Sequence, residues 1–291
     1  ASSPPRVLAQ PLRREVEATT DSIDAAVGYR WGEDSSLPVL GSDLRLEATT
    51  HWFDLREADS ERVRAADFGG TLVTSPYLHP TVTNNVQGLN SSVLASTTAE
   101  LRYSDVEVTL AGSHETAWSW LQWRPYCGVY YGSFEQDYSA RFNNLAIVGD
   151  YYNLREQLAT NYYGGSLGGY ADLLLFENWT LLAGGGITPL WGDHTAANQQ
   201  TARGTIADRY DASFAAGEAT YRLQGRVSLT RSFRHLQLSL FAGVQYWEAA
   251  PTLSYPTATI GQPLSETRRV PTLGFEPWCD WQTGAQIAWL F

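Results

Sequence analysis

Two amino acids and several common sequence features are missing from this chain of 291 residues. Methionine and lysine are both absent, so all 20 basic residues are arginine, and 31 acidic residues give a net charge of −11. An acidic chain without a basic run is a poor candidate for binding nucleic acid. No run of about 18 apolar residues occurs, which excludes membrane-spanning helices. We therefore expect neither a nucleic-acid-binding protein nor a helical membrane protein.

Sequence patterns that commonly mark catalytic sites are also lacking. The five histidines share no metal-ligand spacing, and the motifs GxSxG, HExxH and CxxC do not occur. We therefore predict that the protein is not an enzyme and that it has no metal and no cofactor. A barrel enzyme acting at the outer rim is the minor alternative, and it would depend on Asp193 and His194.

Aromatic residues, in contrast, are abundant, and the end of the chain indicates their use. Between Trp278 and Phe291, one face carries Ile287 with Trp281 and Trp289, whereas the other face is small and polar. Alternation with a period of two predicts a β-strand. An apolar outer band flanked by aromatic residues is typical of a strand in a transmembrane β-barrel. A soluble sandwich with an edge strand is the alternative from this segment alone.

The same alternation recurs along the chain. It predicts strands at 22–31, 43–55, 98–110, 118–131, 162–175, 179–190, 218–230, 236–248 and 278–291. The segment 56–92 is either one long loop or contains a further strand within 62–75. Residues 1–20 contain three prolines and no periodicity, so they are predicted to be an irregular periplasmic segment before a barrel of residues 21–291.

The predicted connections alternate in length. Short connections at 111–115, 176–178 and 231–235 alternate with long ones at 132–159, 193–209 and 249–276. The stretch YYNLREQLA in the first long connection could be helical. Short periplasmic turns and long external loops are typical of membrane barrels. With the last strand descending to the periplasm and 22–31 rising from it, an added strand within 56–92 gives an antiparallel transmembrane β-barrel of about ten strands, with eight and twelve as alternatives.

Strand parity divides the remaining residues between two faces. Arg222 and Arg226 share the inner face with Arg124, opposite Asp105 and Glu107. The predicted lumen-lining set is Arg45, Glu47, Asp105, Glu107, Arg124, Asp172, Arg222, Arg226 and Asp280. Such mixed charges either line a water-filled path that selects ions or pair with each other and fill the interior.

The outer face is predicted to carry the aromatic girdles. The members are Trp31, Trp52, Trp123, Tyr131, Trp179, Tyr221, Tyr246, Trp281, Trp289 and Phe291. The two cysteines, Cys127 and Cys279, also fall on the outer face of strands that are distant in sequence. We therefore expect them to be free, because a disulfide needs Cα atoms within about 7 Å.

A family resemblance rests on three segments. They read LRYSDVEVTLAG, LQWRPYCGVYYGSFEQDYS and NYYGGSLGGYADLLLFENWTLLAGGGITPLWGD, and their shared elements lie at Tyr103 to Glu107, Arg124 to Tyr131, Gly165 to Asp172 and Leu181 to Gly185. This order of strands and tight turns resembles the Legionella-type major outer-membrane protein family. The resemblance covers about residues 98–195 and the terminal strand. It implies a pore-forming β-barrel in a bacterial outer membrane.

These observations predict a porin-like barrel in the outer membrane of a Gram-negative cell. It would allow passive transport of small hydrophilic solutes. The alternative is a structural or adhesive barrel with a filled lumen that acts through its surface loops. Because the chain starts at Ala1 and has no methionine, we expect that a signal peptide has been removed. The expected partners are outer-membrane lipid, the barrel-assembly machinery that reads the strand ending at Phe291, and a homo-oligomer or surface-lattice partner.

Overall fold

The structure is a computed structural model that describes residues 22–31, 35–64, 72–73, 86–87, 92–145, 148–149, 151–203, 208–254 and 272–289. The described part is all β and contains no helix. The strands are β1 (Ser22–Arg30), β2 (Ser36–Leu37), β3 (Gly41–Arg64), β4 (Leu72–Val73), β5 (Val86–Gln87), β6 (Ser92–Glu115), β7 (Leu121–Asn144), β8 (Tyr151–Phe176), β9 (Trp179–Arg203), β10 (Asp208–Ser232), β11 (Leu236–Ser254) and β12 (Thr272–Trp289). The predicted lead-in segment 1–20 lies outside the described residues.

One antiparallel sheet contains ten of these strands. Its order is β1-β3-β6-β7-β8-β9-β10-β11-β12, with β2 paired to β3, while β4 and β5 form a separate pair. The prediction of an all-β antiparallel fold with about ten strands is confirmed. The sheet is not closed, since β1 and β12 are its two edges and do not pair with each other in the described part of the chain.

The strand expected between 56 and 92 is absent from the main sheet, within the described residues. Instead β3 continues to Arg64 and pairs directly with β6. The tenth strand is the two-residue β2, which lies between the segments predicted as strands at 22–31 and 43–55. As a consequence β1 starts at Ser22 beside Phe53 and ends at Arg30 beside Arg45, running toward the short turns. The prediction that this strand rises from the end where β12 finishes is wrong.

Much of the sequence predicted as long loops is strand. The six strands β3 and β6 to β10 are 24 to 26 residues long, roughly 80 Å at ~3.3 Å per residue. The described parts of the predicted loops 132–159 and 193–209 mostly extend these strands, and that of 249–276 extends β11 and β12. The stretch YYNLREQLA belongs to β8, where Tyr152, Leu154 and Leu158 alternate toward a buried face. The turn predicted at 111–115 is strand to Glu115.

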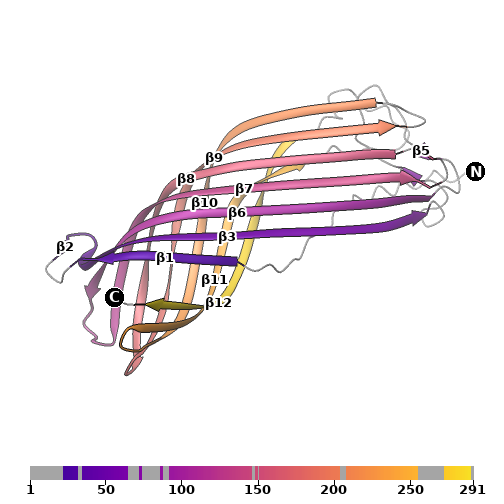
Figure 1. Ribbon diagram of the computed structural model, residues 1–291. Helices are drawn as coiled ribbons and strands as arrows, with labels where there is room; N and C mark the ends of the chain where they lie inside the picture. The colour runs from indigo at the N-terminus through magenta and orange to yellow at the C-terminus, as the bar shows by residue number, and fades with distance from the viewer. Residues whose placement is uncertain are drawn as a thin grey trace, which may run out of the picture.

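The long strands curve together, as Figure 1 shows. The curvature brings the inner face of β6 against that of β10, although three strands separate them in the sheet. Small residues leave room for side chains on this face: a Cβ added at Gly186 of β9 would clash with the hydroxyl of Tyr126 of β7. The sheet therefore has one concave face, where side chains from distant strands meet.

The strands β11 and β12 leave the sheet at the end far from the short turns, which we call the upper end. Pairing between β10 and β11 stops at Arg222 and Trp247, whereas β11 and β12 remain paired as far as Ser254 and Thr272. A register shift between Trp247 and Ala250 marks the point of departure. Beyond it, Phe275 of β12 packs against His194 of β9, with ring centroids 4.9 Å apart. This hairpin therefore lies over the concave face.

Candidate functional site: the concave face and the outer band

The strand register places all nine predicted lumen-lining residues on the concave face. Partners across a ladder share a face, and alternate residues point the same way. Asp105 lies on the same face as His51 of the neighbouring strand, and the same parity extends along each ladder to the others. The predicted parity therefore matches the register. The register alone does not determine which of these residues contact one another.

Arg222 forms the most buried charged group on this face. Its side chain is 2% exposed, and its Nη2 donates to Glu107 Oε2 at 2.8 Å. Its Nη1 donates to Asp105 Oδ2 at 3.5 Å. The guanidinium also stacks over the Tyr130 ring, 4.0 Å from the centroid. The predicted opposition of Arg222 to the two carboxylates on β6 is thus present in the structure.

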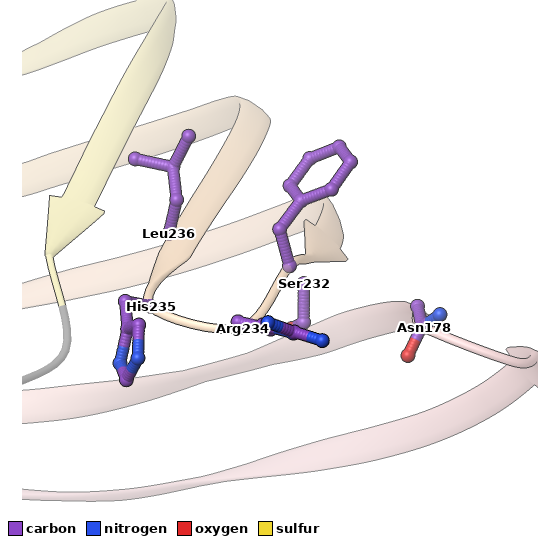
Figure 2. Close-up of a pocket in the computed structure, with 6 residues that line it drawn as sticks. Asn178, Ser232, Arg234, His235 and Leu236 are labelled. Carbon is purple, nitrogen blue, oxygen red and sulfur yellow. The ribbon is translucent and has the colours of Figure 1, made fainter.

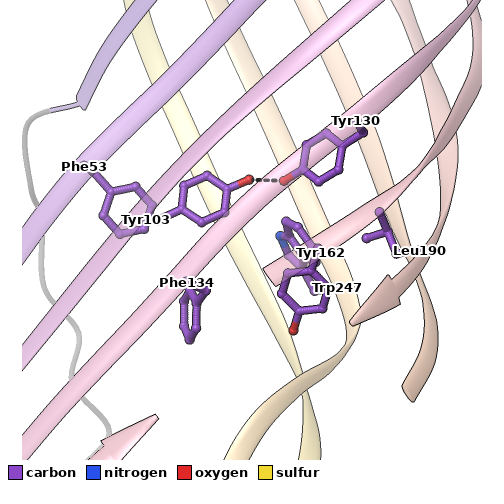
Figure 3. Close-up of a cluster of buried hydrophobic side chains, with 7 residues drawn as sticks. All are labelled: Phe53, Tyr103, Tyr130, Phe134, Tyr162, Leu190 and Trp247. Carbon is purple, nitrogen blue, oxygen red and sulfur yellow. Dashed lines mark hydrogen bonds between the residues drawn. The ribbon is translucent and has the colours of Figure 1, made fainter. Parts of the chain in front are cut away.

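An aromatic cluster adjoins this charged group. It consists of Phe53, Tyr103, Tyr130, Phe134, Tyr162, Leu190 and Trp247, all buried (Figure 3). Tyr103 donates to Asp105 Oδ2 at 2.5 Å, and its hydroxyl lies 2.7 Å from that of Tyr130. The cavity left between these side chains is about 10 Å³, room for a single water molecule. Together the cluster and Arg222 fill the interior at this level, and we call them the interior plug.

The other predicted inner residues form separate, more exposed pairs. Arg124 donates to Asp172 at 2.6 Å, and Arg226 donates to Gln286 at 3.0 Å. Asp280 accepts from Gln282 at 2.8 Å. The remaining two residues, Arg45 and Glu47, lie at the end of the sheet near the short turns, which we call the turn end. There Arg45 pairs with Asp43 at 2.6 Å and Glu47 is exposed. The sequence pattern gave no signal for Asp43 as a partner of Arg45.

The outer face carries an apolar band with an aromatic upper border. Tyr131, Tyr163 and Trp191 lie directly in register on β7, β8 and β9. From there the border moves two residues per strand toward the short turns, through Tyr221, Tyr246 and Trp281. On the other side Trp52 lies two residues higher. The shift is absent across β7 to β9, but wherever it occurs it has the same direction, as a level border across tilted, staggered strands requires.

The band has a lower border as well. On β9 it ends at Trp179, twelve positions before Trp191, and the paired outer residue on β10 is Arg231. Trp123 lies inside the band at 43% exposure, and Trp31 is also exposed near the turn end. The backbone of Trp289 pairs with Leu236, and Phe291 lies outside the described residues. The band thus spans about as many residues as the ~9–11 that a tilted strand needs to cross a bilayer.

Above the upper border the outer face becomes polar. Arg102 of β6 lies 3.8 Å from Glu135 of β7 and 3.9 Å from Asp54 of β3. Arg155 of β8 lies 3.9 Å from Asp137. We call this polar part of β3 and β6 to β10 the β-extension. It projects roughly 40 Å along the strands beyond the border, given about 12 residues at ~3.3 Å each.

The β-extension has a buried polar ladder on its concave face, which sequence reasoning missed. Tyr152 donates to Gln200 at 3.0 Å, Gln200 donates to Asn198 at 2.8 Å, and Asn198 donates to Glu156 at 3.4 Å. Burial raises the pKa of Glu156 to about 7, and the hydrogen bond from Asn198 opposes only part of that shift. Along 152–158 the available signal was the alternation of Tyr152, Leu154 and Leu158 with polar residues, whereas 198–200 is polar throughout and gave no contrast.

Glu156 makes stability depend on pH in this region. Its folded pKa of about 7 lies above the ordinary 4.5, so its contribution is complete below pH 4.5 and is lost as the pH rises through about 7. We expect E156Q to remove a pH-dependent term on the order of 2 kcal/mol between pH 4.5 and 8. Unfolding midpoints across this range test it. The exposed Glu135 on the outer face provides the control E135Q, whose stability should depend on pH as that of the wild-type protein does. If the stability of E156Q also kept the wild-type pH dependence, the assignment to Glu156 would be contradicted.

A shallow hollow lies at the turn end, between the connections that join β8 to β9 and β10 to β11 (Figure 2). Asn178, Arg234 and His235 line it, and their side chains diverge. No acidic residue is among the described residues that line it. Asp193 and His194, the alternative catalytic pair, lie on opposite faces of β9: Asp193 accepts from Trp191 Nε1 and His194 is bonded to Thr160.

Several features are absent from the described residues. They contain no cluster of side chains suited to a metal ion and no helix long and apolar enough to span a membrane. Cys127 and Cys279 are both free, as predicted. Comparison of the chain with protein-family models, with curated proteins and with solved structures found no match.

Proposed function

We propose that this protein is a transmembrane β-barrel of a bacterial outer membrane. The observation that carries the proposal is the apolar band on the outer face, bordered above by the row Tyr131, Tyr163 and Trp191 and followed by charged residues. Exposed side chains such as Val129, Leu167 and Ile287 fill the band. A soluble protein rarely exposes so large an apolar surface, whereas lipid covers it in a membrane.

We further propose that the barrel is closed inside and serves a structural or adhesive role through its β-extension. The support is the interior plug, in which Arg222 is 2% exposed and the remaining cavity is about 10 Å³. Such a gap does not pass hydrated solutes. The charged outer face of the β-extension suits contact with a polar surface outside the cell.

A porin-like barrel is the second candidate function. It is favoured by the accessible charges below the interior plug, where Glu47 is exposed and the side chains of Arg45 and Arg124 are 37% and 21% exposed. These residues fit a water-filled lower chamber. Passage of solutes would then require displacement of the plug.

The two native cysteines test the membrane assignment directly. Cys127 lies in the middle of the outer band and Cys279 lies beside Tyr246 near the upper border. In intact membranes we expect Cys127 to resist a charged maleimide, because lipid covers it and keeps the thiol protonated, and to react only after the protein is unfolded in detergent with denaturant. Labelling of C279S and C127S variants separates the two sites. Rapid reaction of Cys127 with the charged reagent, or release of the protein by carbonate, would contradict the assignment.

Conductance in planar bilayers distinguishes the two candidate functions. For the wild-type protein we expect no discrete current steps, because the side chains of the interior plug leave a gap of only about 10 Å³ between them. The variant W247A removes a plug side chain that is 2% exposed, and it should introduce steps or raise leakage. Discrete ohmic steps from the wild-type protein would reject the closed interior and favour the porin.

A further inference from the structure

The two edges of the sheet run in the same direction. β1 ends beside Arg45 at the turn end, and β12 ends beside Leu236 at the same end. Both arrows point the same way in Figure 1. Nine strands form the continuous path from β1 to β12. An odd number of alternating strands can close into a ring only if one neighbouring pair is parallel.

The residues of β1 alternate as expected for a strand in the wall of a barrel. Ile23, Val27 and Tyr29 point outward and are 62%, 73% and 63% exposed. They lie in register with residues of β3 inside the outer band. On the inner side β1 presents Asp24, which faces His51 of β3. Its alternation therefore matches that of the other band strands.

His51 joins both edges of the sheet on the concave face. Its Nδ1 is bonded to Asp24 of β1, and its Nε2 accepts a hydrogen bond of 3.3 Å from Gln282 Nε2 of β12. The ring is 7% exposed. Since β1 pairs with β3, the hydrogen bond from Gln282 to His51 draws β12 toward the side of β1 that has no partner among the described strands.

We infer that β1 and β12 close the barrel through one parallel seam, held on the inside by Asp24, His51 and Gln282. This inference rests on the proposed membrane location, because lipid offers no hydrogen-bond partners and an open sheet edge is not tolerated there. Asp24 and Gln282 both point inward, at the height of His51. Their outward neighbours Ala25 and Thr283 therefore become cross-strand neighbours in the seam.

Disulfide formation tests this seam. In a background of C127S and C279S, one variant carries A25C with T283C and a second carries T50C with T283C. Thr50 is the β3 partner of Ala25. Adjacent strands are about 4.8 Å apart, whereas strands on either side of β1 are about twice that distance apart, beyond the ~7 Å limit for a disulfide. In two further variants, I23C or V27C replaces A25C beside T283C. They cover a change of register by two residues in either direction.

With a mild oxidant in native membranes, we expect A25C/T283C or one of its two register variants to link, and T50C/T283C not to. The linked product closes a loop of almost the whole chain, so it is identified by its altered migration after heat unfolding. H51A should lower the yield at least several-fold while the protein remains in the membrane fraction. Linking of T50C/T283C would overturn the seam in favour of eight strands with β1 displaced.

The two proposals fail in different ways. A protein that resists carbonate extraction but forms none of the β1–β12 links contradicts the seam and leaves the membrane assignment intact. A protein that forms the A25C/T283C link but is released by carbonate contradicts the membrane assignment and retains the parallel seam.

Discussion

R222Q is expected to lower the free energy of unfolding by about 3–5 kcal/mol, because it leaves Asp105 and Glu107 buried without their cation. It also removes the guanidinium from the face of Tyr130. The measurement is the urea midpoint of unfolding in detergent, followed by the heat-modifiable shift on gels. R226Q is the matched control, since Arg226 lies on the same strand and face but is more exposed, and its described partners are the amide of Gln286 and the ring of Phe241.

A triple variant separates loss of a partner from loss of packing. R222L combined with D105N and E107Q removes the cation together with both carboxylate charges. Replacing a whole buried charged group with neutral residues is often close to neutral, whereas removing one partner is not. We therefore expect the triple variant to recover most of the stability lost in R222Q. Equal stability of R222Q and R226Q would show that Arg222 is not a buried partner.

V227R is expected to destabilise the folded protein by about 2–4 kcal/mol, because it places a charge on the lipid face near the middle of the band. Val227 points outward, is 49% exposed and lies between Tyr221 at the upper border and Arg231 at the lower one. The measurement is the free energy of unfolding from reversible folding into, and unfolding from, lipid vesicles. If the sheet were soluble, V227R would change the free energy of unfolding little, since the arginine would remain in water.

The control for V227R is F233R. Phe233 is also exposed, but it lies two residues beyond Arg231, in the short turn after β10 at the lower border. A charge near the interface costs only about 0–1 kcal/mol. The expected difference between the two variants therefore reports depth in the membrane. Equal costs at both positions would argue against a membrane band with these borders.

The sequence was most informative where one side of the sheet is apolar. Along β7, for example, Trp123, Cys127, Val129 and Tyr131 alternate with polar residues, and this contrast predicts both the strand and its faces. Above Tyr131 the contrast reverses: the outward residues are polar, whereas Phe134, Tyr138 and Phe142 face the concave side. The apolar residues there lie on the opposite face from the outer band, so the pattern no longer fits a strand that faces lipid. The long β-extension was therefore predicted as loops.

Direction and height were beyond the reach of sequence parity. Parity places Arg222 and Arg226 on one face, but it does not say that Arg222 meets Glu107 while Arg226 reaches Gln286. Those contacts depend on the curvature of the sheet and the stagger of its strands. In the same way, the alternation in β1 predicts a band strand without giving its direction. That direction depends on the pairing of β3 with β6.

The unbroken length of the strands determines how the β-extension would bear force. β7 and β8 pass without interruption from the outer band to Asn144 and Tyr151 at the far end. A pull on that end acts along the strands, whereas their hydrogen bonds lie across them. To be drawn out, the β7–β8 hairpin would have to slide past both β6 and β9, so the bonds of two ladders would resist together rather than open one at a time. The β-extension is thus arranged as a tether loaded in shear.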